Sequence, residues 1–201
     1  MDKKILDFFT GLRRNLSGGN LNLGNIVGKA SSKLQSKSQT FTFQALPANL
    51  NELRALPEAA LTDPFATAAL SLLALTRWQD SKAESIEMLN FLKGPESCSP
   101  AELQHISDRF MDGTFYKVRS YFEGAVPSNN YNPATPYRVK VSSTPYSFEN
   151  EGWATLYLHS GGADSPRPVK LRKKPSTGQW FLVEIQYLSD VRPPVALDKW
   201  A

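Results

Sequence analysis

The alternation of apolar and polar positions divides the chain into a helical half and a strand-rich half. The first strong helix follows Asp63-Pro64, an N-cap residue with proline at the first helical position, where its missing N–H costs nothing. Residues 65–78 are then apolar on nearly every side. A helix of this kind is expected to be central and buried.

Two more helices are predicted by serines placed three residues before a glutamate. The segments SKAE (81–84) and SPAE (99–102) both fit a capping box. We expect the first of these helices to run through Lys93 and the second to end at Gly113, with Gly-Pro stopping the former.

Beyond residue 113 the composition favours strands. TFYKVRSYF (114–122) and YRVKVS (137–142) alternate in part, and an earlier short strand is predicted at FTFQAL (41–46). Three further β segments follow, the last two joined by the turn PSTG: WATLYLHS, PVKLRKK and QWFLVEIQYL. Short turns between successive strands imply an antiparallel meander. The predicted fold class is therefore α+β, with N-terminal helices packed on a C-terminal antiparallel β-meander.

Charge separates an N-terminal arm from the rest of the chain. Residues 1–40 hold seven Lys or Arg and two Asp, whereas the remainder holds sixteen basic and seventeen acidic residues. We predict a basic, Gly/Ser/Asn-rich arm (1–40) and a single α+β domain (41–201). A near-neutral body argues against specific nucleic-acid binding.

The arm contains a short amphipathic helix within residues 3–16. Phe8, Phe9 and Leu12 lie on its apolar face and are expected to be covered, because soluble proteins seldom expose such a patch. Docking on the body, on a second copy or on a protein partner is the favoured interpretation, and a membrane surface is the less favoured one. No run is long enough to span a bilayer, no signal-peptide pattern follows, and the single Cys98 suits a reducing compartment, so we expect a cytoplasmic protein.

Strong catalytic and cofactor motifs are absent from the sequence. It has no GxxxxGK[ST], no G-x-G-x-x-G, no HExxH and no paired CxxC, so we predict no cofactor, no metal and no catalytic residue. His105 is expected to be a partly buried structural histidine. Cys98 has no base near it in the sequence and is interpreted as an incidental thiol.

The loop HSGGADSPRP (159–168) is the first candidate for a binding site. Prolines on both sides of Arg167 limit its backbone freedom, and a restrained guanidinium is a good two-point partner for a carboxylate or phosphate. Asp164 and His159 would be the neighbouring polar groups. The alternative is structural: Arg167 pairs internally with Asp164 or a distant Glu and locks the loop on the body.

The loop SNNYNPATPY is the second candidate. Asn130 favours a turn, and Tyr131 combines an aromatic ring with a polar tip that could line a pocket. The alternative is that this loop only caps an edge of the sheet.

Several long segments resemble one bacterial family. They are LTDPFATAALSLLAL, IEMLNFLKGPESCSPAE, SYFEGAVPSNNYNPATPY, GGADSPRPVKLRKKPSTGQWFLVE and the ending DKWA. They are similar to the domain-of-unknown-function 6935 family from about residue 41 to the C-terminus. The chain departs mildly from that family at Val183 and at Asp198-Lys199-Trp200. The resemblance implies a bacterial cytosolic setting and supplies no catalytic residues.

The leading functional hypothesis is a non-enzymatic bacterial binding or assembly module, attached through its arm. The alternative is a small-molecule-binding protein or enzyme with a pocket between sheet and helices, lined by Asp164, Arg167 and His159. The order of helices before a curved meander is also similar to the cone of the nuclear-transport-factor-2-like superfamily. That analogy does not choose between the two hypotheses.

Overall fold

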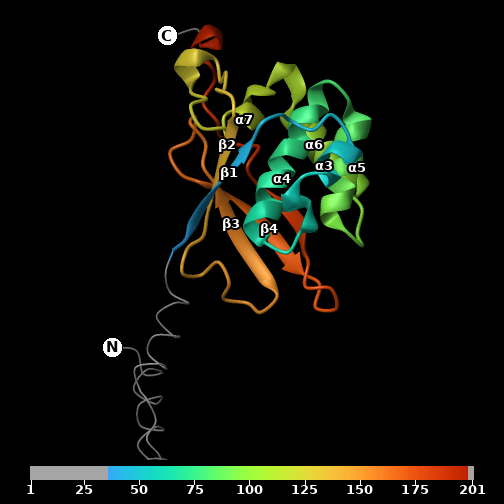
Figure 1. The fold of residues 1–201 in the computed structure, drawn as a ribbon. Coiled ribbons are helices and arrows are strands. Elements are labelled where there is room, and N and C mark those ends of the chain that lie inside the picture. The colour runs from blue at the N-terminus through green and yellow to red at the C-terminus, as the bar shows by residue number, and fades with distance from the viewer. Residues whose placement is uncertain (1–35, 199–201) are drawn as a thin grey trace, which may run out of the picture. The chain divides into compact units, whose positions relative to one another are not determined.

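The structure, a computed structural model, describes residues 36–198. A single antiparallel sheet of five strands, in the spatial order β1-β2-β3-β4-β5, forms one layer of this unit (Figure 1). The strands are β1 (Ser38–Phe43), β2 (Tyr137–Ser142), β3 (Trp153–Leu158), β4 (Arg167–Lys173) and β5 (Trp180–Ile185). The antiparallel meander predicted from the short turns is thus confirmed.

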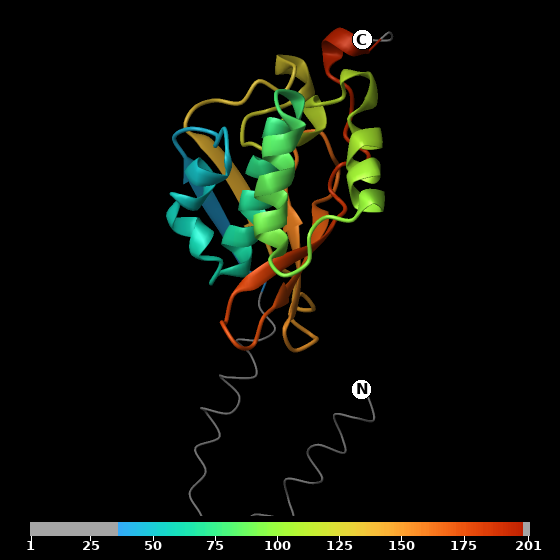
Figure 2. The same cartoon turned by 90° about the vertical axis from the view of Figure 1, so that its right-hand side faces the viewer.

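Helices form the second layer. The described residues contain α3 (Leu50–Arg54), α4 (Pro64–Thr76), α5 (Lys82–Lys93), α6 (Pro100–Arg109) and α7 (Tyr116–Arg119). Helix α4 contacts all five strands, and α5 packs on α4 and on β5, so these helices cover one face of the sheet (Figures 1 and 2). The α+β class is confirmed.

The helix boundaries agree with the capping signals. The side chain of Asp63 accepts a hydrogen bond from the backbone N–H of Phe65 at 2.9 Å, and every residue from Phe65 to Leu75 is buried. Ser81 caps α5, and Ser99 forms a complete capping box with Glu102 at the start of α6. These local bonds fix where α6 begins, and α6 supplies one wall of the groove described below.

The strand predicted at residues 114–122 is wrong. This segment forms the short helix α7 and only an isolated bridge between Phe122 and Val139. Its buried apolar residues are Val118, Tyr121 and Phe122, and Tyr121 and Phe122 follow Val118 by three and four residues, the spacing of one helical face. The β-favouring composition of the segment misled the prediction, because burial on that face outweighs local propensity.

The first strand begins three residues earlier than the boundary expected at residue 41. All six residues of β1 pair with β2, from Ser38 opposite Ser142 to Phe43 opposite Tyr137. The chain divides into residues 1–35 and 36–201. Phe8, Phe9 and Leu12 lie outside the described residues, so the docking of the arm remains a prediction.

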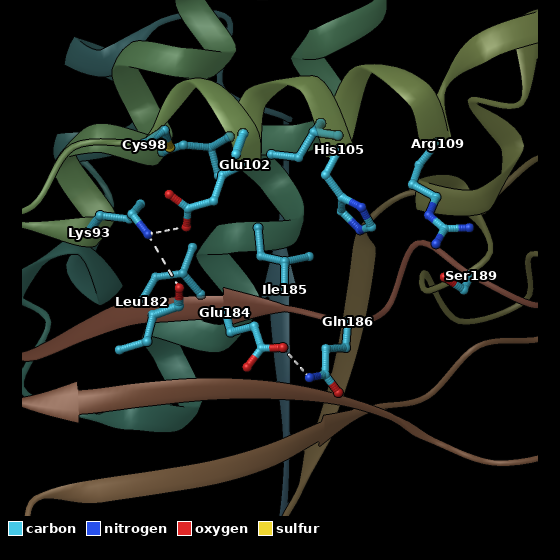
Figure 3. Close-up of a pocket in the computed structure, with 14 residues that line it drawn as sticks. Lys93, Cys98, Glu102, His105, Arg109, Leu182, Glu184, Ile185, Gln186 and Ser189 are labelled. Atoms are coloured by element: carbon cyan, nitrogen blue, oxygen red, sulfur yellow. Dashed lines mark hydrogen bonds and ion pairs between the residues drawn. The ribbon is translucent and has the colours of Figure 1, made fainter.

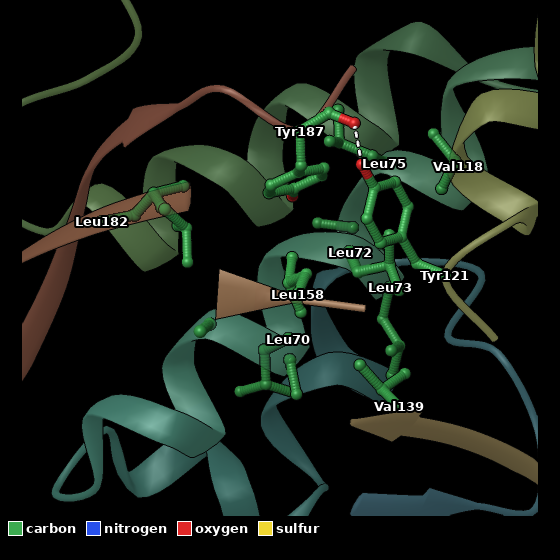
Figure 4. Packing of buried hydrophobic residues seen from close by; sticks show 14 of the residues in the cluster. Leu70, Leu72, Leu73, Leu75, Val118, Tyr121, Val139, Leu158, Leu182 and Tyr187 are labelled. Atoms are coloured by element: carbon green, nitrogen blue, oxygen red, sulfur yellow. Dashed lines mark hydrogen bonds between the residues drawn. The ribbon is translucent and has the colours of Figure 1, made fainter. Parts of the chain in front are cut away.

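The space between α4 and the sheet is filled by side chains. Three tyrosines that are at most 1% exposed belong to the hydrophobic core: Tyr121, Tyr131 and Tyr187. The Tyr121 hydroxyl donates to the Tyr187 carbonyl (Figure 4). The Tyr187 hydroxyl bonds to that of Ser71 at 2.9 Å. Burial raises the pKa of both phenols. No helix within residues 36–198 has the length and apolar character needed to cross a bilayer.

Candidate functional site

The glycine pair of the 159–168 loop is held by close backbone approach. The N–H of Gly161 donates to the Ser120 carbonyl at 2.8 Å, and a Cβ on Gly161 would collide with the carbonyl oxygen of Ala125. A Cβ on Gly162 would meet the hydroxyl of Tyr131 and lie 2.8 Å from Val191 Cγ1. Glycine is required at both positions because the loop is packed against the body.

The charged residues of this loop are bonded within the protein. Arg167 donates to the Ser165 hydroxyl at 3.1 Å and to the Asp190 carbonyl at 3.0 Å. Asp164 pairs with Arg192 instead of with Arg167. The internal pairing left open by the sequence therefore occurs, but with partners in the C-terminal segment.

The second candidate loop contacts the same C-terminal segment. Tyr131 stacks on Tyr116 at 5.5 Å between ring centroids, and its hydroxyl donates to the Arg192 carbonyl at 2.7 Å. The side-chain oxygen of Asn130 accepts from the N–H of Ala196 at 3.4 Å. Both loops thus hold the chain between Asp190 and Ala196.

His159 lies apart from these four residues. Its Nε2 forms a hydrogen bond of 2.7 Å with the hydroxyl of Ser142, the last residue of β2. Burial, and secondarily the charge of Lys140, lower the pKa of His159. The five candidate residues do not converge on one cavity; none of them lines the groove described next.

A groove of about 480 Å³ runs between α6 and β5, at the edge of the sheet (Figure 3). Its volume falls within the usual range for ligand sites. The labelled residues of α6 and of the 182–189 segment advance in the same direction, so the two walls run side by side. The groove is lined by Leu89, Lys93, Cys98, Ala101, Glu102, His105, Ile106, Arg109, Leu182, Val183, Glu184, Ile185, Gln186 and Ser189.

One end of the groove is closed by an ion pair. Lys93, whose side chain is 9% exposed, donates to Glu102 at 2.6 Å and to the Val183 carbonyl at 3.3 Å. Burial raises the pKa of Glu102, but the bonds from Lys93 and Ser99 outweigh it and hold this pKa below its usual value. The Lys93 ammonium is therefore already neutralised.

The thiol of Cys98 lies beside this ion pair. Burial raises its pKa; the charge of Lys93 opposes the rise and that of Glu102 adds to it. A protonated thiol is a poor nucleophile. The groove thus holds no activated cysteine.

The other end of the groove contains polar side chains without partners. Among the side chains that the structure describes, no acceptor pairs with the Arg109 guanidinium, and neither the His105 ring nor the Ser189 hydroxyl has a hydrogen-bond partner. Glu184, in contrast, is paired with Lys170 at 2.6 Å and accepts from Gln186; these bonds lower its pKa. The free polar groups are at the Arg109 end.

Sequence reasoning missed this groove. The prediction of a partly buried, structural His105 is wrong, because this residue is exposed. Cys98 was interpreted as incidental, and Arg109 was not singled out. A usable signal was present: Glu102, His105 and Arg109 recur at three- and four-residue spacing on one face of a capped helix. No such spacing reveals that β5 lies opposite. Within the described residues no cluster of His, Cys, Asp and Glu could hold a metal ion.

The fold and the groove define an α+β domain with a groove along one sheet edge. The chain belongs to the family described as domain of unknown function (DUF6935), whose model matches residues 45–195 and so includes the whole groove. Neither a curated protein nor a solved structure matches it. The analogy to the nuclear-transport-factor-2-like cone therefore stays a prediction.

Proposed function

We propose that this chain is a non-enzymatic binding module that receives an extended peptide segment of a protein partner in the groove between α6 and β5. The observation that carries the proposal is the position of the groove along a terminal strand. Five consecutive residues, Leu182–Gln186, line one wall. In the described residues no strand pairs with the outer edge of β5.

A terminal strand offers backbone donors and acceptors to an added strand. Part of this edge is already used: the N–H of Trp180 donates to the Leu61 carbonyl at 2.7 Å, and Lys93 bonds the Val183 carbonyl. These contacts occupy the edge of β5 at Trp180 and Val183. The remaining stretch from Val183 to Gln186, about 10 Å for three strand steps, is long enough for a few residues of an extended segment.

The dimensions of the two walls support an extended occupant. A step of four residues along α6 rises about 6 Å. A step of two residues along a strand advances about 6.7 Å. Because α6 runs beside β5, alternate side chains of an added strand would meet successive turns of the helix (Figure 3). The apolar floor of Leu89, Ile106 and Leu182 would receive one of them.

The state of the polar groups supports binding over catalysis. Lys93 and Glu102 neutralise each other, and the Cys98 thiol is kept protonated. The alternative, a small-molecule pocket between sheet and helices lined by Asp164, Arg167 and His159, has less support, since none of these residues lines the groove and the space between α4 and the sheet is occupied by side chains. The residues expected to line it bond elsewhere.

The test uses a random linear peptide library displayed against the full chain. Enriched peptides should lose binding to Ala101→Trp, which fills the groove, and retain binding to Ala83→Trp. Ala83 is a matched control because both alanines are exposed second residues of capped helices. Methylation of backbone nitrogens in an enriched peptide should weaken binding at alternate positions only, as strand addition requires.

Two results would contradict the proposal. One is an absence of enriched peptides. The other is equal binding to both tryptophan variants, which would place any peptide outside the groove. Amide exchange provides a second measurement: the bound peptide should protect the β5 edge and leave the β1 edge unchanged.

The arm is the second part of the proposal. Phe8, Phe9 and Leu12 would attach the module, in a bacterial cytosol, to a copy of itself or to a protein partner rather than to a membrane. Phe8→Asp with Phe9→Asp should then lower the oligomeric state or remove a partner in sizing experiments. Flotation with anionic vesicles that depends on these phenylalanines would favour the membrane instead.

A further inference from the structure

The charges that line the groove do not cancel. Glu102 is paired with Lys93, and Glu184 is paired with Lys170. Arg109 has no acceptor in the part of the chain that the structure describes. The groove therefore presents one uncompensated cation at its far end.

The surroundings of Arg109 do not neutralise it. Its own backbone carbonyl accepts from Lys117 Nζ at 3.0 Å, which brings a second cation close. The pKa of Lys117 is lowered by burial first and by Arg109 second, while Asp190 opposes both. The pKa of Lys117 stays lowered despite Asp190, and among the described side chains no ion pair joins Arg109 to Asp190.

Two further polar side chains stand beside this cation. His105 is exposed one turn earlier on α6, and Ser189 follows β5 on the opposite wall. Figure 3 shows His105 and Arg109 both extending from α6 toward the 182–189 segment. A guanidinium flanked by an imidazole and a hydroxyl is a suitable setting for a carboxylate.

The spacing of residues along α6 and along an added strand also indicates where in the bound peptide the carboxylate lies. The apolar floor at Ile106 and the guanidinium at Arg109 are separated by less than one helical turn on one wall. In an added strand, two successive side chains on the same face are about 6.7 Å apart, which bridges the two positions. The donors on α6 lie beside the added strand and would meet its side chains, not its chain end. This position favours a side-chain carboxylate over the carboxylate of a chain terminus.

We infer that the partner segment carries an Asp or Glu whose side-chain carboxylate is bound by Arg109, with an apolar residue two positions away resting on the floor at Ile106. This specificity rests on the proposed function, since it assumes that the groove receives a strand. It names what distinguishes a true partner from any other extended segment.

The experiment compares peptides enriched from the random library described above. They should contain an acidic residue two positions from an apolar one, and changing that acid to its amide should weaken binding about tenfold or more. Arg109→Gln should weaken the acidic peptide by a similar factor and leave the amide peptide unchanged. Arg138→Gln, which removes an exposed arginine of β2, is the control and should change neither.

Comparison of the two single variants, Ala101→Trp and Arg109→Gln, separates this inference from the proposed function. If peptides bind in the groove, as judged by Ala101→Trp, but ignore Arg109→Gln, the carboxylate assignment fails and the groove stands. If no peptide is sensitive to Ala101→Trp, the groove itself fails. Loss of binding on amidation of the peptide C-terminus, with no effect of the acidic side chain, would overturn the assignment in favour of a chain terminus.

Discussion

Two parts of the surface carry charged side chains, and they differ in what those side chains already bind. In the 159–168 loop, Asp164 pairs with Arg192, and Arg167 donates to Ser165 and to the Asp190 carbonyl. At the far end of the groove, Arg109 has no acceptor among the described side chains. Charged side chains are exposed in both parts of the surface, so exposure does not distinguish them. What distinguishes them is whether each side chain is already bonded, because a ligand gains little from a group that must first give up a partner.

The comparison also assigns different consequences to mutation. Substitutions in the loop should change stability, since its bonds hold the C-terminal segment to the body. Substitutions at the Arg109 end of the groove should change binding and leave stability almost unaltered.

The largest effect is expected for Gly162→Ala. The added Cβ would meet the Tyr131 hydroxyl and Val191, so the loop must move, at a cost of about 2–3 kcal/mol in the free energy of unfolding. Chemical denaturation measures this loss. Because the hydroxyl is the nearest atom, Gly162→Ala combined with Tyr131→Phe should recover part of it. If Gly162→Ala left the free energy of unfolding unchanged, the loop would not pack as described.

The second effect tests the closed end of the groove. Glu102→Gln removes the counter-charge of the nearly buried Lys93, and we expect a loss of about 1 kcal/mol near neutral pH, reduced by the 41% exposure of the Glu102 side chain. The folded-state pKa of Glu102 is depressed below 4.5. Its contribution is therefore present above pH 4.5 and is lost as the pH falls through the folded-state value. The difference between wild type and variant, followed by thermal unfolding, should shrink in that acidic range; a constant difference would contradict the pairing.

Tyr131→Phe should cost about 1 kcal/mol. It removes the bond to the Arg192 carbonyl while keeping the ring that stacks on Tyr116. Amide exchange of the 190–196 segment should rise in the variant. If exchange there is unchanged, the two loops do not hold the C-terminal segment.

The fold was largely predictable because its signals are local. The caps at Asp63, Ser81 and Ser99 bond within two or three residues of themselves, so the sequence contains the whole interaction. Residues 114–122 failed because their helical state depends on burial of Val118 and Phe122 by distant elements.

The candidate site was less predictable for the same physical reason. The restraint of Arg167 by its prolines is visible in the sequence, but its acceptor, the Asp190 carbonyl, is twenty-three residues away. Likewise, Lys93 and Glu102 are found to cancel only once α5 and α6 are placed side by side. Whether a charged side chain is paired depends on residues distant in the sequence, and only the tertiary structure brings these residues together.

Arg167→Lys is expected to cost less than about 1 kcal/mol. Both bonds of the guanidinium go to neutral acceptors at the surface, and an ammonium can keep one of them. The melting temperature should therefore fall only slightly, and peptide binding in the groove should be unaffected. A large loss of stability would mean that the loop depends on the planar two-point contact.

Arg109→Gln should have the smallest effect on stability, close to zero. The guanidinium has no acceptor in the described part of the chain, so its removal breaks no bond, and it relieves the repulsion that lowers the pKa of the neighbouring Lys117. Glutamine is also well tolerated near the end of a helix. Denaturation of wild type and Arg109→Gln should give the same midpoint and slope, whereas affinity for an acidic peptide should fall. Arg109→Glu sharpens the test, because a carboxylate there would be attracted to Lys117 and should repel the acidic peptide. A loss of more than about 1 kcal/mol in Arg109→Gln would show that the guanidinium is already engaged in the folded protein. The two ends of the groove would then be alike, and Arg109 would not be free to bind a carboxylate.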